Sequence, residues 1–87
     1  MIKVYDNNGE TLDRYIILFM DEKEGNLYRS LSLSYDPAAA NGCAIHSQAL
    51  DGDHLGRLIR FMDLPYRTRQ FCERFELNTV NNVYKVA

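Results

Sequence analysis

Apolar and polar positions along the chain come in short blocks that favour strands over long helices. Residues 2–6 form the first apolar-rich block, and Asn7, Asn8 and Gly9 follow it. An Asn-Gly pair tolerates the positive φ angles of a tight turn, so the residues from Thr11 onward can return as a second strand. The pattern predicts an N-terminal β-hairpin.

Six consecutive apolar residues, 15–20, form the next block. They are rich in β-branched and aromatic types, and the run is too short for an isolated helix. We therefore expect a central strand that is covered on both faces. The charged residues 21–26 predict a turn after it.

Leucine or tyrosine at positions 31, 33 and 35 alternates with serine at 30, 32 and 34. This period of two predicts a half-buried strand with one face in water. Pro37 cannot join a strand ladder and Asn41-Gly42 closes the segment, so residues 36–42 are expected to be a loop. A weaker strand is predicted over residues 43–50, a turn over 51–53 and a short strand over 58–61.

Leu64-Pro65 signals the start of a helix, because proline is favoured where its missing N–H needs no partner. The helix is predicted over residues 65–77, with Leu64, Thr68, Phe71, Cys72 and Phe75 on its apolar side. Residues 79–87 fit either an edge strand or a tail. Together these elements predict one α+β domain over residues 1–87, with an antiparallel sheet of four to six strands packed against one C-terminal helix.

Composition agrees with a small globular protein: the chain has 87 residues, 46% of them hydrophobic, and a formal net charge of −2. No apolar run approaches membrane-spanning length, and residues 1–6 lack the pattern of a signal peptide. Two cysteines in a chain of this size favour thiols in a reducing compartment over a disulfide. We expect a cytoplasmic protein that does not bind membranes.

Cysteine and histidine side chains offer one candidate chemistry. Cys43 and His46 lie close in sequence, whereas His54 and Cys72 stand apart. Zinc sites usually present two close ligand pairs, and a cysteine nucleophile needs a nearby base, which His46 or His54 would have to supply. A small thiol or zinc-dependent enzyme is therefore kept as an alternative, but we expect no metal, no cofactor and no catalytic residue.

Charge is unevenly distributed. Residues 1–53 contain four basic and nine acidic side chains, whereas residues 54–87 contain six basic and three acidic ones. Arginine pairs bidentately with carboxylates and phosphates, so the C-terminal arginines form a candidate binding surface. The acidic side chains of two predicted turns could instead imitate phosphates and enter a basic channel on a partner. The candidate partner-binding residues are Arg57, Arg60, Arg67, Arg69, Arg74, Asp21, Glu22, Glu24, Asp51 and Asp53.

Residues 5–15, residues 54–59 and residues 63–65 together resemble a group of short proteins of unassigned activity that are encoded by phages and other mobile elements. The resemblance covers about half of the chain, and residues 34–37 in the middle depart from it. It implies no catalytic residue. It implies a context, since small phage proteins without catalytic motifs often bind and block host machinery, including CRISPR effectors.

The preferred hypothesis is a non-catalytic protein-binding module, in the form of a mobile-element accessory protein that inhibits host defence, such as an anti-CRISPR protein. The main alternative is nucleic-acid binding by the C-terminal arginines, which the isoelectric point near 5.6 disfavours. Two copies of the chain would associate through an uncovered sheet edge or through the face of residues 30–34.

Overall fold

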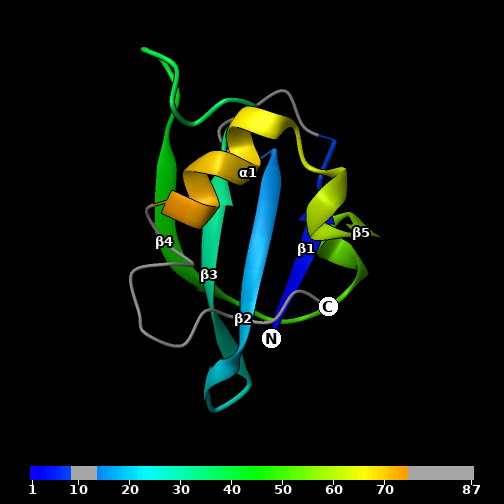
Figure 1. Ribbon diagram of the computed structural model, residues 1–87. Helices are drawn as coiled ribbons and strands as arrows, with labels where there is room; N and C mark the ends of the chain where they lie inside the picture. The colour runs from blue at the N-terminus through cyan, green and yellow to red at the C-terminus, as the bar shows by residue number, and fades with distance from the viewer. Residues whose placement is uncertain (9–13, 75–87) are drawn as a thin grey trace.

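The computed structural model describes residues 1–8 and 14–74, and these form an open, five-stranded antiparallel sheet with one α-helix (Figure 1). The sheet has the order β4-β3-β2-β1-β5. The predicted α+β class, strand number and C-terminal helix are confirmed. The elements are β1 (Ile2–Asp6), β2 (Tyr15–Glu24), β3 (Leu27–Leu33), β4 (Ala44–Ala49), the 3-10 helix η1 (Asp53–Leu55), β5 (Arg57–Ile59), the 3-10 helix η2 (Phe61–Asp63) and α1 (Tyr66–Cys72).

The predicted N-terminal strand pair forms as β1 and β2. They pair antiparallel from Ile2 opposite Phe19 to Asp6 opposite Tyr15. Asn8 has a φ of 53°, and its N–H donates to Asp6 Oδ1 at 2.7 Å, which begins the turn. The rest of the predicted turn lies outside the described residues.

The apolar run lies in β2, the central strand of the sheet, as predicted. Residues 15–19 are buried on both faces of this strand. The prediction of a turn over residues 21–26 is wrong. β2 continues to Glu24 as an exposed ribbon paired with β3, after a register irregularity between Phe19 and Lys23, and the turn is confined to Gly25 and Asn26. Backbone hydrogen bonds to β3 therefore extend the strand through charged residues, although these side chains pack against no core.

The alternating serine pattern describes β3 only in part. The strand ends at Leu33, so Tyr35 lies beyond it and is 58% exposed. Ser30 is buried at 2% exposure, because the face that was expected to be wet is covered in its middle. The loop over residues 36–42 and the strand within residues 43–50 are both confirmed.

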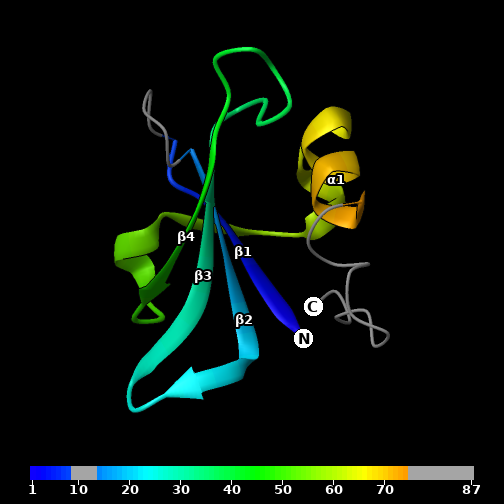
Figure 2. The same cartoon turned by 90° about the vertical axis from the view of Figure 1, so that its left-hand side faces the viewer.

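One face of the sheet packs against η2 and α1 (Figure 2). Leu64 and Cys72 are buried there with Phe61, in a core that also takes side chains from β1, β2 and β3. Pro65 immediately precedes the helix, and Thr68 Oγ1 donates to the carbonyl oxygen of Tyr35 at 2.6 Å. The described helix ends at Cys72. Residues 75–77 of the predicted helix, and residues 79–87 with their predicted edge strand or tail, lie outside the described residues.

The opposite face is crossed by residues 50–56, which connect β4 at one edge of the sheet to β5 at the other edge (Figure 2). Leu55 of η1 is buried in this connection against Tyr5, Ile16 and Leu18. The predicted strand over residues 58–61 is shifted: β5 is Arg57–Ile59, and Phe61 instead begins η2. Phe61 is 3% exposed because it faces the helix-side core.

Candidate protein-binding groove at the β5 edge

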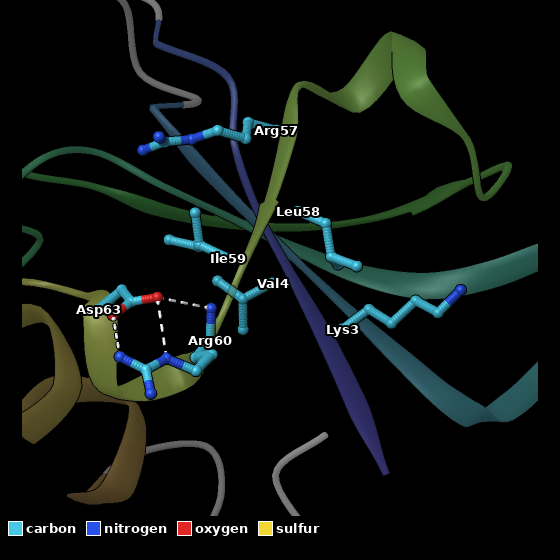
Figure 3. A pocket seen from close by; sticks show the side chains of 7 residues that line it. All are labelled: Lys3, Val4, Arg57, Leu58, Ile59, Arg60 and Asp63. Carbon is cyan, nitrogen blue, oxygen red and sulfur yellow. Dashed lines mark hydrogen bonds and ion pairs between the residues drawn. The ribbon is translucent and has the colours of Figure 1, made fainter.

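A groove with a volume of about 750 Å³ runs beside β5, at one edge of the sheet (Figure 3). Its residues come from β1, from β5, from Arg60 just before η2 and from Asp63 at the end of η2. We call this site the β5 groove, and its lining residues are Lys3, Val4, Arg57, Leu58, Ile59, Arg60 and Asp63.

Gly56 allows β5 to lie close to β1. Its φ is +113°, a conformation that residues with a Cβ rarely adopt, and a Cβ built there would stand 2.3 Å from the carbonyl oxygen of Asp6. The strand that follows pairs Arg57 with Asp6 and Ile59 with Val4. The contact between Gly56 and the end of β1 therefore fixes where the groove begins.

Arg60 and Asp63 close the other end of β5. The Asp63 carboxylate accepts hydrogen bonds from the Arg60 backbone N–H at 3.0 Å, from Nε at 3.3 Å and from an Nη at 3.0 Å (Figure 3). These contacts hold the pKa of Asp63 below its usual range. The Asp63 N–H in turn donates to the Arg60 carbonyl oxygen at 2.9 Å, and these bonds together hold the turn of η2 that follows the strand.

Arg57 is bound more loosely. Its side chain is 78% exposed, and its guanidinium stands 3.8 Å from Asp6 Oδ2. The Asp6 carboxylate also accepts bonds from Arg14 Nε at 3.0 Å and from the Asn8 N–H at 2.7 Å. Burial raises the pKa of Asp6, but these bonds together with the nearby arginine charges outweigh burial and lower it. Arg57 therefore adds little to a carboxylate that is already bound, and its own charge faces solvent.

Lys3 connects the groove to the crossover segment. Its Nζ donates to Asp51 Oδ2 at 2.7 Å, and the hydroxyl of Tyr5 donates to Asp51 Oδ1 at 2.5 Å. Asp51 is one of the predicted acidic binding residues, yet both of its oxygens are engaged within the fold. Its first role is to attach the β4–β5 connection to β1.

Large apolar side chains are exposed on β5 and just after it. Leu58 is 58% exposed, Met62 63% and Tyr66 65%. Arg69 lies beside the last two, with an Nη 3.2 Å from the Met62 sulfur and its guanidinium carbon 5.6 Å from the centre of the Tyr66 ring. The sequence does not reveal this exposure, because that of Leu58 depends on the edge position of β5 and that of Met62 on the 3-10 helix η2.

The five predicted arginines do not form one patch. Arg57 and Arg60 line the β5 groove and Arg69 packs at Met62 and Tyr66. Arg67 pairs with Asp36 at 3.3 Å, and with Arg74 it lines a separate pocket of about 220 Å³ on the helix. The arginines therefore divide between separate sites, with Arg57 and Arg60 in the β5 groove and Arg67 and Arg74 at the helix pocket.

The predicted acidic residues are likewise separated. Asp21 binds the N-terminal ammonium at 2.5 Å, and Glu22 forms a bidentate pair with Arg29 at 2.9 and 3.0 Å. Glu24 is exposed on the same ribbon. Asp53 is exposed on η1, beyond Asp51 on the crossover. The ribbon and the crossover are thus two acidic regions, neither of them in the groove.

The cysteines and histidines occupy different elements. Cys72 is the last residue of α1 and is buried, and Cys43 is half-buried just before β4. Both are thiols. His46 is on β4, where its Nδ1 lies 3.2 Å from an Nη of Arg29 on β3. His54 belongs to η1 in the crossover. Across residues 1–8 and 14–74, no three His, Cys, Asp or Glu side chains group so as to hold a metal ion. No helix within these residues has the length and apolar character to cross a membrane.

Fold and groove together define a small α+β domain with an open sheet and a solvent-exposed edge site. Comparisons of the chain with protein-family models, with curated proteins and with solved structures found no match. The β5 groove is therefore the feature from which a function can be inferred.

Proposed function

We propose that this protein is a non-catalytic protein-binding module that holds its partner in the β5 groove. The observation that carries the proposal is the pairing of an exposed guanidinium with an exposed leucine at adjacent positions of an edge strand. The Arg57 side chain is 78% exposed, and Leu58 is 58% exposed. Arginine is enriched at protein interfaces, and exposed apolar surface rimmed by polar residues marks interaction sites.

The resemblance to phage and mobile-element proteins extends this proposal to a biological setting. In that setting the protein acts in the cytoplasm of a bacterial cell, and its partner is a component of host defence such as a CRISPR effector. The support for this part is the sequence resemblance together with the small size of the domain. The groove supports protein binding independently of that setting.

Nucleic-acid binding is less well supported by the geometry. Arg60 and Arg67 are each paired with a carboxylate of the fold, at Asp63 and Asp36. A phosphate backbone would have to compete with these carboxylates, and the arginines lie at separate places on the surface. We therefore do not adopt this alternative.

The test compares capture of proteins from a bacterial lysate by the wild-type chain and by two charge-matched variants. Arg57→Glu changes the groove, and Arg74→Glu makes the same charge change in the separate helix pocket. We expect a protein that the wild type and Arg74→Glu retain equally and that Arg57→Glu retains at least about tenfold less, a difference of roughly 1.4 kcal/mol. A photo-reactive residue at position 62 should cross-link to that protein, and one at position 48 on β4 should not. Equal retention by all three proteins, or no retention above background, would contradict the proposal.

A further inference from the structure

The direction of the backbone groups on β5 follows from the hydrogen bonds of β1. The Asn7 N–H donates to the Arg14 carbonyl, and the Met20 N–H donates to the Met1 carbonyl, both at 2.9 Å. In an antiparallel pair, hydrogen-bonded and non-hydrogen-bonded positions alternate along the strand. Lys3 and Tyr5 therefore direct their backbone groups toward β2, while Val4 and Asp6 direct theirs toward β5.

The same alternation assigns the groups of β5. Arg57 pairs with Asp6 and Ile59 with Val4, so these two residues use their N–H and C=O groups toward β1. Leu58 stands opposite Tyr5, so its N–H and C=O point away from the sheet. Among residues 1–8 and 14–74, β5 is the last strand of the sheet order, so Leu58 presents one donor and one acceptor at the outer edge.

Side chains on either side of this backbone site differ in character. Arg57 and Ile59 point to one face of the strand, and Leu58 points to the other, as Figure 3 shows. Arg57, with its exposed guanidinium, shares the lining of the groove with Val4 and Ile59, which are apolar. A strand laid along the edge would thus meet an arginine on one face and a leucine on the other.

From this arrangement we infer that the partner contributes an extended acidic segment, which adds to the sheet as a strand hydrogen-bonded to Leu58. The residue opposite Leu58 is apolar, and the residue opposite Arg57 is an Asp or Glu whose carboxylate binds the guanidinium bidentately. This inference rests on the proposed function, because it assigns the chemistry of the partner to the same groove.

Charge selects this occupant over a second copy of the chain. Two copies joined antiparallel at Leu58 would bring their Arg57 side chains to diagonal positions on one face, where like charges repel. Arg60 follows β5 in the same chain, and its charge is already paired with Asp63 in the cap of η2. Arg57 has only the 3.8 Å contact with Asp6, a carboxylate already held by Arg14 and Asn8, so an acidic strand supplies a carboxylate at hydrogen-bond distance.

The first experiment selects peptides from a random linear 12-residue display library on the folded, full-length protein. We expect the enriched peptides to carry Asp or Glu adjacent to an aliphatic residue. Their affinity should fall at least about tenfold on Arg57→Glu, and less on Arg57→Lys, which keeps the charge but not the bidentate geometry. Arg74→Glu should leave the affinity unchanged. Peptides without acidic enrichment, or with equal affinity for Arg57→Glu, would overturn the inference.

The second experiment tests strand addition itself. Leu58→Pro removes the outward N–H while the donors of Arg57 and Ile59 toward β1 remain, and Leu58→Ala removes the side chain but keeps the N–H. We expect the selected peptide to bind Leu58→Ala more tightly than Leu58→Pro. A scan of single N-methyl groups along the peptide gives the same information on the unaltered protein, since methylation at the residue opposite Leu58 should abolish binding.

Hydrogen exchange and the molar mass from light scattering distinguish the remaining outcomes. Bound peptide should protect the Leu58 amide and leave the already bonded Ile59 amide unchanged. A protein that is dimeric by light scattering without peptide, and monomeric as Leu58→Pro, would show that a second copy occupies the edge and would overturn the acidic-strand inference. If lysate capture depends on Arg57 but Leu58→Pro and N-methylation have no effect, the proposed function stands and only strand addition is wrong.

Discussion

At the scale of single residues, the most consequential contact joins positions that are 46 residues apart. The Tyr5 hydroxyl donates to Asp51 Oδ1, and Lys3 binds the other carboxylate oxygen. Burial, the bond to Asp51 and the negative charge of Asp51 raise the pKa of Tyr5 to about 12. The contact joins β1 to the crossover that carries the chain toward the β5 groove.

Replacing Tyr5 with Phe should destabilise the domain by about 1–2 kcal/mol, because a hydrogen bond to a charged group is lost while the ring stays buried. The measurement is the free energy of unfolding from urea titration at neutral pH. Tyr28→Phe provides the matched control, since this half-buried tyrosine has no hydroxyl bond to a carboxylate in the described residues. Equal losses in the two variants would show that the Asp51 contact contributes nothing.

The same group gives a pH dependence. The pKa of Tyr5 is raised from 10.0 to about 12 on folding, so its contribution is complete below pH 10 and is lost as the pH rises toward 12. Urea midpoints of the wild type should therefore fall over this range, and those of Tyr5→Phe should fall less. Asp51 behaves in the opposite sense, because its bonds to Lys3 and Tyr5 lower its pKa below 3.8, so its contribution is lost in acid. Parallel alkaline curves for the two proteins would refute the assignment to Tyr5.

At the scale of elements, the segment between β5 and α1 alternates between core and surface. Phe61 and Leu64 are each 3% exposed, whereas Met62 between them is 63% exposed. The two buried side chains fill the space between the sheet and the helix. Attachment of α1 therefore depends on the short 3-10 helix η2 and Leu64 as much as on α1 itself.

Leu64→Ala should cost about 2–5 kcal/mol of folding free energy, because it leaves a cavity at the contact between helix and sheet. Met62→Ala should change stability by no more than about 0.5 kcal/mol, since its side chain is exposed. Thermal unfolding followed by circular dichroism gives both values. A small effect at position 64 would mean that the helix contact contributes little to the stability of the domain.

Elements driven by burial were predictable from the sequence, and those driven by pairing alone were not. The run over residues 15–20 and the Leu64-Pro65 helix start each follow from local hydrophobicity or backbone chemistry. The extension of β2 through Glu24 depends on its partner strand, which a local pattern does not contain. For the candidate site, the exposure of Arg57 was expected, but the edge position that exposes Leu58 arises from pairing with β1 more than fifty residues earlier, which local patterns do not reveal.

At the scale of the whole molecule, the fold mixes the two oppositely charged halves of the chain. Asp6 and Asp36 of the acidic half pair with Arg57 and Arg67 of the basic half. The separation of charge along the sequence is therefore partly cancelled in space. Among the described residues, the exposed charge that remains is local: Arg57 at the sheet edge, 3.8 Å from Asp6, and acidic side chains on the β2–β3 ribbon and the crossover.

The two thiols should report the opening of the whole domain. Cys72 has no exposed surface, whereas Cys43 is half-buried at the start of β4. Under native conditions iodoacetamide should alkylate Cys43 at least about 100-fold faster, if opening of the helix contact costs roughly 3 kcal/mol. Mass spectrometry of timed samples measures both rates, and unfolding in urea should equalise them. Comparable native rates would show that the helix contact opens readily.

Gly56 controls which strand terminates the sheet. A methyl group there would collide with the carbonyl oxygen of Asp6, and the positive φ would add strain, so Gly56→Ala should push β5 away from its neighbour. β1 would then become the outermost strand, and its alternate residues Ile2, Val4 and Asp6 would present their unpaired backbone groups to solvent. One added methyl group would thus replace an edge with a single outward-facing residue by a longer edge that is more prone to aggregation.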